Sequence, residues 1–121
     1  MTIDELSVRA IEIRKQFAEL EKVRWGREWK IEDIALGLAG DVGDLVKLIQ
    51  SKEGIRPAHA DIDARLAHEL ADCMWCLFVI ANRYGLNIER AFMGTMDELE
   101  AWIARAARQE PEVVAPPAVK P

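Results

Sequence analysis

The sequence has few of the residues that cross-link a chain or carry it through a membrane. It contains two cysteines, and aromatic residues make up 7% of its 121 residues. The longest apolar segment, 70–81, is interrupted by Asp72 and is too short to span a bilayer. No basic start followed by an apolar stretch opens the chain. We therefore expect a cytoplasmic protein with no disulfide framework and no membrane partner.

Basic charge is also scarce, with 16 Lys and Arg residues against 21 Asp and Glu residues and a net charge of −5. An acidic chain without a basic run repels a phosphate backbone, so duplex DNA or RNA is not an expected partner. Half of the residues are hydrophobic, which is enough to bury a core and exceeds the range of disordered chains. The length is that of one globular domain.

The two cysteines, Cys73 and Cys76, lie three residues apart inside a predicted helix. A redox pair normally occupies the first turn of a helix after a strand, and structural zinc needs four ligands, for which only His59 and His68 are available. Buried apolar packing is therefore the favoured interpretation of both thiols. His68 is expected to project to a different side of the helix from Glu69.

Apolar residues recur at helical spacing in four segments, and no stretch shows the alternation of a hairpin. A capping box at Thr2–Glu5 predicts a first helix to about residue 24, and a second helix is expected at about 31–52. A third helix runs from a cap at Asp61 or Asp63 to Gly85, and Asn87 caps a fourth. The pattern predicts an all-α, four-helix antiparallel bundle over residues 1–110. The tail at 111–121 holds four of the five prolines and is expected to be disordered.

The third helix is apolar in nearly every direction around its axis, which one partner face cannot cover. Such a helix is central in a bundle or buried between subunits. The sequence therefore predicts that the bundle is completed by oligomerisation, as a homodimer or a homotetramer.

Two pairs of carboxylates lie beside the apolar stripes of the second and third helices. Asp41 and Asp44 are three residues apart, as are Glu69 and Asp72, so each pair lies on one face of its helix. If the two helices pack antiparallel, the pairs face each other. Four converging carboxylates would be costly unless they were protonated or neutralised by cations. Oxygen ligands at this density suit Mg²⁺, or Mn²⁺.

Plainer interpretations of these acids remain open. Asp41 and Asp44 can be solvated or paired with Lys47. Arg65 can reach Glu69 at i, i+4 and form a structural ion pair. Asp72 lies in a strongly apolar segment with no basic residue one turn before it, which favours a functional role.

Residues near the acidic helices give further candidates. Gly37 and Gly40 share the carboxylate side of the second helix, which indicates either close helix packing or room for a ligand beside Asp41. Trp29, just before that helix, is placed to stack on a planar ligand, although packing is the default for a tryptophan. Trp75 is expected to point away from the line of Asp72.

The segments LAGDVGDL at 38–45, HELADCMW at 68–75 and YGLNIE at 84–89 resemble the MazG-like family of all-α nucleoside triphosphate pyrophosphohydrolases. The resemblance covers roughly residues 29–100. It implies Mg²⁺-dependent cleavage of a nucleoside triphosphate between the α and β phosphates, which gives the monophosphate and pyrophosphate. By position, it assigns the metal ligands to Asp41, Asp44, Glu69 and Asp72, and we expect Asp41 or Asp44 to activate the attacking water.

The chain departs from the family pattern at two places. Its first acidic pair is Asp-x-x-Asp, one methylene shorter at each position than the usual Glu-x-x-Glu, and the segment 92–98 has no lysine. Triphosphate binding therefore needs other cations, for which Lys47, Arg83 and Arg90 are the candidates, and Trp29 is the candidate for contact with the base. The departures leave open an alternative function, an oligomeric helical protein that binds metal or nucleotide without turnover.

Overall fold

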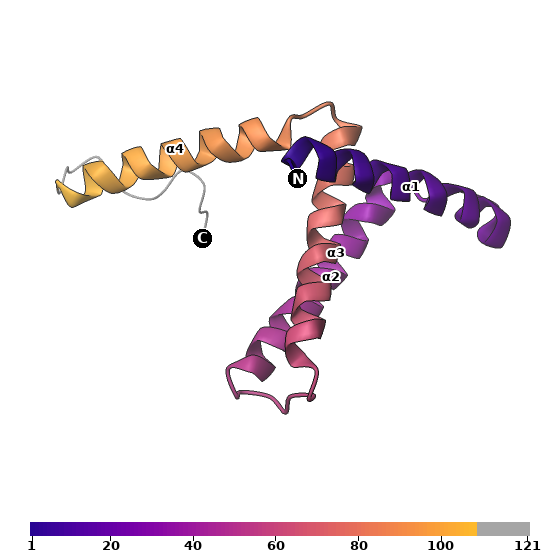
Figure 1. Ribbon diagram of the computed structural model, residues 1–121, viewed down its shortest axis with the longest axis horizontal. Coiled ribbons are helices and arrows are strands. Elements are labelled where there is room, and N and C mark those ends of the chain that lie inside the picture. Colours follow the sequence, from indigo (N-terminus) through magenta and orange to yellow (C-terminus); the bar gives the residue numbers. More distant parts are fainter. Residues whose placement is uncertain (109–121) are drawn as a thin grey trace. The chain divides into compact units, whose positions relative to one another are not determined.

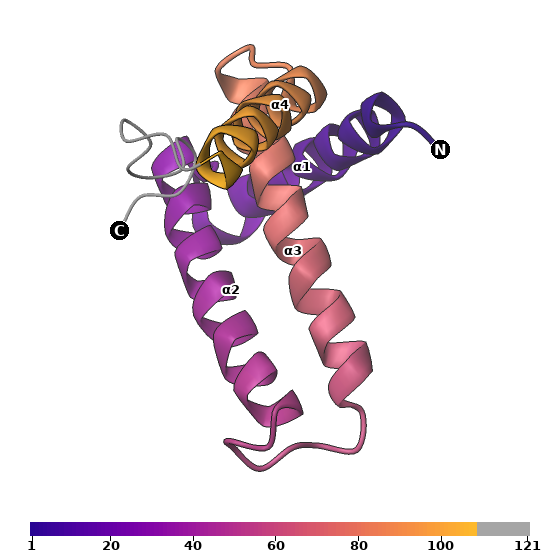
Figure 2. The ribbon, with the colours of Figure 1, turned by 90° about the vertical axis from the view of Figure 1, so that its left-hand side faces the viewer.

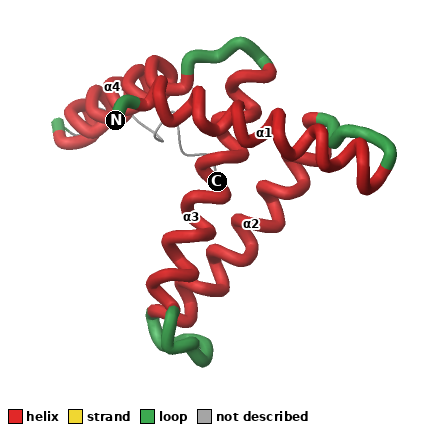
Figure 3. Tube along the Cα trace, turned by 45° about the vertical axis from the view of Figure 1, so that its right-hand side comes forward, coloured by secondary structure: helices red, strands yellow, loops and turns green. Residues whose placement is uncertain are grey.

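The computed structural model describes residues 1–108, which form four helices and no strand (Figure 1, Figure 3). The helices are α1 (Ile3–Trp25), α2 (Ile31–Lys52), α3 (Ile62–Arg83) and α4 (Ile88–Ala107). The predicted all-α class and the number of helices are confirmed. The prediction for the tail at 111–121 falls outside the described residues.

The chain divides into two compact units. The first, Met1–Gly85, contains α1, α2 and α3, and the second begins at Leu86 and contains α4. A single domain over 1–110 stays a prediction. All of the acidic residues discussed above belong to the first unit.

The helix caps follow the sequence closely. In α1 the Glu5 backbone N–H donates to Thr2 Oγ1 at 3.1 Å and the Thr2 N–H donates to Glu5 Oε2 at 3.1 Å, which is the predicted capping box. In α4 the Arg90 N–H donates to Asn87 Oδ1 at 2.9 Å. Asp61 precedes α3 at the cap position but makes no capping hydrogen bond with its side chain. Of the two cap residues expected for α3, Asp61 and Asp63, the structure has Asp61 at the cap position, without the expected bond.

Helices α2 and α3 form an antiparallel hairpin that carries most of the core of the first unit (Figure 2). Ile34 on α2 packs with Cys76 and Val79 on α3, and all three side chains are buried. Helix α1 contacts α3 through the apolar edge of this cluster, where Ile11 and Trp75 contribute. This pairing brings the middle of α2 beside the middle of α3, where the acidic residues lie.

A buried ion pair fixes the connection between α1 and α2. Glu21 is 1% exposed and accepts hydrogen bonds from Arg14 Nη1 at 2.6 Å and Arg14 Nη2 at 2.8 Å. The Trp29 N–H also donates to Glu21 Oε1 at 2.8 Å, and Arg14 Nη2 donates to the Trp29 carbonyl at 3.1 Å. The hydrogen bonds from Arg14 lower the pKa of the Glu21 carboxyl, against its burial. Both charges are satisfied, so the pair holds residue 29 against α1.

Part of the apolar surface of the hairpin is not covered within the first unit. Phe78, Val79 and Ala81 of α3 are buried, whereas Leu70 and Leu77 are 55% and 47% exposed. None of the described helices is both long and apolar enough to cross a membrane.

Candidate metal centre

Three carboxylates converge where α2 and α3 face each other. Asp41 projects from the middle of α2, and Glu69 and Asp72 project from α3, one turn apart. Each side chain offers one oxygen, and these oxygens lie within 4.8 Å of one another. All three residues are partly buried. In residues 1–108 this is the one group of three or more acidic, histidine or cysteine side chains with such spacing.

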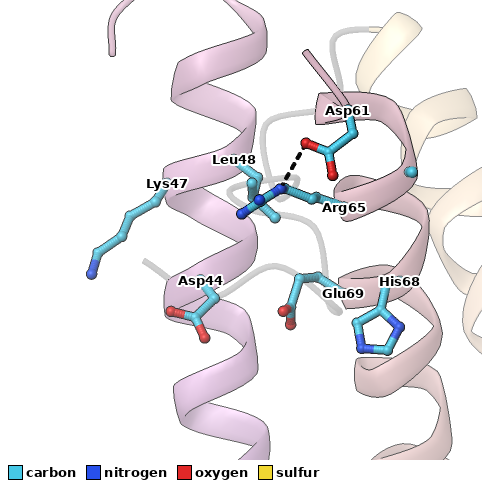
Figure 4. Close-up of a pocket in the computed structure, with 8 residues that line it drawn as sticks. Asp44, Lys47, Leu48, Asp61, Arg65, His68 and Glu69 are labelled. Carbon is cyan, nitrogen blue, oxygen red and sulfur yellow. Dashed lines mark hydrogen bonds and ion pairs between the residues drawn. The ribbon is translucent and has the colours of Figure 1, made fainter. Parts of the chain in front are cut away.

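The fourth predicted ligand, Asp44, lies beside this group and is not part of it. Asp44 is exposed and lines a cavity together with Glu69, which it faces from α2 (Figure 4). Its charge is close enough to raise the pKa values of Asp41 and Glu69 further. The structure therefore brings three of the four predicted ligands together and leaves Asp44 on the wall of the adjoining cavity.

The cluster carries negative charge that its surroundings do not neutralise. Burial raises the pKa of the Asp41 carboxyl, and the charge of Asp72 raises it further. Burial and the charge of Asp41 likewise raise the pKa of Glu69. Among the described residues, no lysine or arginine forms an ion pair with Asp41, Glu69 or Asp72, and His68 is the basic side chain that contacts one of them. An oxygen-rich, electron-rich site of this kind favours a bound cation.

One oxygen of the cluster lacks any partner. Glu69 Oε2 is buried and accepts no hydrogen bond from a described residue. The alternative ion pair with Arg65 does not form, because Arg65 Nε donates instead to Asp61 Oδ1 at 2.9 Å. A buried carboxylate oxygen without a donor is costly, and a metal ion would satisfy it.

Cys76 contacts the Asp41 carboxylate from the apolar core of the hairpin. Its Sγ–H donates to Asp41 Oδ2 over 3.8 Å, and the side chain is 3% exposed. Burial, followed by the charge of Asp41, raises the pKa of the Cys76 thiol to about 11, so the thiol stays protonated at neutral pH. The burial predicted for both cysteines is confirmed for Cys76, whereas Cys73 is only partly buried. The hydrogen bond of Cys76 with Asp41 depends on how α2 and α3 face each other, which the sequence does not indicate.

His68 corrects one statement of the sequence analysis, that no basic residue lies one turn before Asp72. Its Nε2 lies 3.1 Å from Asp72 Oδ2. Residues four apart meet on one helix face, and the spacing of His68 and Asp72 is therefore a signal that could have revealed the contact. His68 is also the basic partner that the sequence analysis had missed for Asp72.

Two cavities adjoin the cluster, and their linings differ in chemistry. The larger has a volume of about 530 Å³. Its polar lining comes from α2, α3 and the cap of α3, and consists of Asp44, Lys47, Asp61, Arg65, His68 and Glu69.

The second cavity is mostly apolar. It has a volume of about 450 Å³ and is lined by Ile13, Phe17, Asp41, Ala71, Asp72 and Trp75. The rings of Phe17 and Trp75 meet at a tilt of 59° with their centroids 5.9 Å apart. Trp75 Nε1 donates to the Ala10 carbonyl at 3.0 Å, which fixes the indole. Trp75 thus shares a cavity with Asp72, and the expectation that it points away from that residue is wrong.

The predicted substrate-binding residues are spread more widely. Lys47 lines the larger cavity, although Figure 4 shows its side chain extending away from α3. Trp29 stacks on Trp25, with the ring centroids 6.1 Å apart. It precedes the first residue of α2, and Asp41 lies about 15 Å further along that helix. Arg83 ends α3, about 16 Å along the helix from Asp72. Within this unit, therefore, Trp29 and Arg83 are not brought to the carboxylates, and Arg90 belongs to the second unit.

The glycines of α2 leave open space. A Cβ built at Gly37 or Gly40 would meet nothing within 4 Å. Close packing of another described helix against these two positions, one of the two interpretations of the sequence, is therefore not found. The other interpretation, room beside Asp41, agrees with this open surface.

Comparisons of this chain with protein-family models, with curated proteins and with solved structures found no match. The interpretation of the site therefore depends on its own geometry and on the three sequence segments described above.

Proposed function

We propose that this protein is a Mg²⁺-dependent nucleoside triphosphate pyrophosphohydrolase, which releases a nucleoside monophosphate and pyrophosphate. The observation that carries the proposal is the convergence of Asp41, Glu69 and Asp72 within 4.8 Å, with no lysine or arginine of the described chain to neutralise them. The segments that contain these residues are the same ones that resemble the MazG-like family.

The donor set fits a hard divalent cation. All three side chains offer oxygen, the ligand that Mg²⁺ and Mn²⁺ prefer, and Glu69 Oε2 is buried without a donor. Zinc is a poorer fit, because Cys76 is protonated and already donates to Asp41. Asp41, Glu69 and Asp72 would hold the Mg²⁺ ion, which would supply Lewis-acid activation of the phosphoryl group.

The position of each residue at the site indicates its role. Asp41, Glu69 and Asp72 hold the cation, and His68 orients the Asp72 carboxylate through its contact of 3.1 Å. Asp44 lies outside the group but faces Glu69 across the larger cavity. Of the two candidates for the general base, Asp44 is therefore the better placed, because its carboxylate is not needed as a ligand.

The second cavity suits a nucleobase. Phe17 and Trp75 offer aromatic faces directly beside Asp41 and Asp72, and stacking on aromatic rings binds bases with little dependence on their identity. We therefore assign base contact in the first unit to Phe17 and Trp75 in place of Trp29.

We also propose that two or more copies associate through the hairpin, as a homodimer or a homotetramer. On α3, Leu70, Met74 and Leu77 are 41–55% exposed, and on α2, Val42, Val46 and Ile49 are 45–47% exposed. Each set follows i, i+4, i+7 and forms one apolar stripe. Stripes of this kind are typical of surfaces that pack against another helix. The two free cysteines suit a reducing compartment, the cytoplasm.

One observation favours a second candidate function, a protein that binds metal or nucleotide without hydrolysis. Asp44 is outside the carboxylate group, so the activation of water depends on a side chain that is short and exposed. This candidate predicts stabilisation by Mg²⁺ without release of pyrophosphate.

The two candidates are separated by measuring pyrophosphate release from ribo-, deoxyribo- and damaged nucleoside triphosphates, with Mg²⁺, with Mn²⁺ and with a chelator. The proposal predicts metal-dependent release that Asp72→Asn abolishes. Asp63→Asn is the matched control, because Asp63 lies on the same helix, is exposed and pairs with Lys52. Metal-dependent stabilisation without release from any substrate would support the binding protein instead.

A further inference from the structure

The larger cavity is lined by both acidic and basic side chains. Asp44 and Glu69 lie at the side of the carboxylate cluster, and Arg65, paired with Asp61, reaches across the cavity one turn away on α3 (Figure 4). The four-residue step from Arg65 to Glu69 corresponds to a rise of about 6 Å along α3. A ligand that is held at the carboxylates through a cation, and that carries further negative charge, can therefore extend directly to Arg65.

The guanidinium of Arg65 is held by one hydrogen bond and keeps its other donors available. Its Nε donates to Asp61 Oδ1 at 2.9 Å, and the side chain of Arg65 remains 48% exposed. The two Nη groups donate to no described residue. Since a guanidinium binds phosphate oxygens with two parallel N–H donors, the free edge of Arg65 matches a phosphate in the cavity.

The two cavities beside the carboxylates differ in their other side chains. Arg65 and His68 line the larger cavity, whereas Phe17 and Trp75 line the second, whose remaining lining is aliphatic or acidic. The basic side chains therefore lie in the larger cavity and the aromatic ones in the second.

We infer that Arg65, oriented by Asp61, binds the terminal phosphates of a polyphosphate chain whose first phosphate lies at Asp41, Glu69 and Asp72. The inference rests on the proposed function, which it deepens by giving the substrate a direction: base at Phe17 and Trp75, β- and γ-phosphates at Arg65. Arg65 is a binding residue in this arrangement, and Asp61 is a positioning residue. The same chemistry would recognise a nucleoside triphosphate or an inorganic tripolyphosphate.

The test is calorimetric titration of the full chain with magnesium tripolyphosphate, with a nucleoside triphosphate and Mg²⁺, with a nucleoside monophosphate and Mg²⁺, and with Mg²⁺ alone. The variants are Arg65→Met, Arg65→Lys and Asp61→Asn. Arg9→Met is the matched control, because Arg9 is an exposed helical arginine with one local partner, Glu12.

Arg65→Met is expected to weaken binding of magnesium tripolyphosphate and of the triphosphate about 10-fold or more, as for loss of a hydrogen bond between charged groups. Binding of Mg²⁺ alone and of the monophosphate is expected to stay unchanged. Arg65→Lys retains the charge but not the paired donors, so part of the loss should remain, and Asp61→Asn should give a smaller loss than Arg65→Met.

Three results would overturn the inference: unchanged tripolyphosphate binding in Arg65→Met, an equal loss for the monophosphate, or no binding of tripolyphosphate by the unaltered chain. The third result overturns the inference even if a nucleoside triphosphate binds through Arg65, because the contact is assigned to the phosphates alone. Specific binding through Arg65 without pyrophosphate release would support the inference and refute hydrolysis. Pyrophosphate release that is unchanged in Arg65→Met would support hydrolysis and refute the inference.

Discussion

Cys76 on α3 donates a hydrogen bond from Sγ to Oδ2 of Asp41 on α2, over 3.8 Å and across 35 positions of the sequence. This contact joins the buried core to the carboxylate cluster, because Cys76 also packs against Ile34 and Val79. The thiol therefore has two roles, filling the core and holding one oxygen of Asp41 in place.

The chemical state of this thiol gives a first prediction. With a pKa of about 11 and an exposure of 3%, Cys76 should resist alkylation by iodoacetamide at pH 8 in the folded chain. It should react only when the chain unfolds in urea, which peptide mass spectrometry would show. Rapid labelling of Cys76 in native buffer would mean that the hairpin is open at this point.

The ion pair of Arg14 and Glu21 predicts a large loss of stability on mutation. Arg14→Met leaves a buried carboxylate without its partner, and we expect the free energy of unfolding to fall by about 3–5 kcal/mol. Arg9→Met, which breaks an exposed pair with Glu12, should change it by less than about 0.5 kcal/mol. Urea denaturation of both variants makes the comparison, and similar losses in the two would contradict the buried role of Glu21.

The same pair predicts a dependence of stability on acid pH. The pKa of Glu21 is lower in the folded chain than its ordinary value of 4.5, so its stabilising contribution is complete above pH 4.5 and is lost as the pH falls through the folded pKa. The loss should be absent in Glu21→Gln. Denaturation curves between pH 3 and pH 6 would test this, and an identical pH profile in the variant would disprove it.

The metal cluster has the opposite pH dependence. The pKa values of Asp41 and Glu69 are raised above their ordinary 3.8 and 4.5, so the folded chain holds these protons more tightly than the unfolded chain. Without metal, the contribution of these two carboxyl groups to stability therefore decreases as the pH rises above their ordinary pKa values and through the raised ones. Glu69→Gln should stabilise the metal-free chain at pH 7, and thermal unfolding in chelator would measure it.

Mg²⁺ should reverse this effect in the unaltered chain. A cation present at 100 times its dissociation constant stabilises the folded state by about 2.7 kcal/mol, and Glu69→Gln should lose most of that gain. A melting temperature that responds to Mg²⁺ equally in the variant and the unaltered chain would place the cation elsewhere.

The exposed stripes predict self-association. Leu77→Glu places a charge in the middle of the apolar stripe on α3 and should reduce the mass measured by sedimentation, with helical content unchanged. Val8→Glu is the control, since Val8 is 59% exposed on α1 and lies outside both stripes. A monomeric unaltered chain would contradict the proposed assembly.

The helices and their caps could be predicted from the sequence because they depend on local spacing. Thr2 and Asn87 cap α1 and α4 as expected, and the acidic pair of α3 was identified from its position beside apolar residues. The convergence of Asp41 with Glu69 and Asp72 required only that α2 and α3 pack antiparallel.

The remaining parts of the site depend on distances across helices, which one sequence does not define. The position of Asp44 outside the group depends on the rotation of α2 about its own axis, as does the contact of Cys76 with Asp41. Trp75 and Phe17 share a cavity because α1 crosses α3 at that point. His68 is different, since its spacing from Asp72 was visible in the sequence.

If Asp41, Glu69 and Asp72 together bind a divalent cation, titration with Mn²⁺ followed by electron paramagnetic resonance should show saturable binding that Mg²⁺ displaces. Asp41→Asn, Glu69→Gln and Asp72→Asn should each weaken the binding of Mn²⁺, by about 10-fold or more, whereas Asp63→Asn should leave it unchanged. Absence of saturable binding, or equal affinity in all four variants, would mean that these carboxylates do not form a metal site.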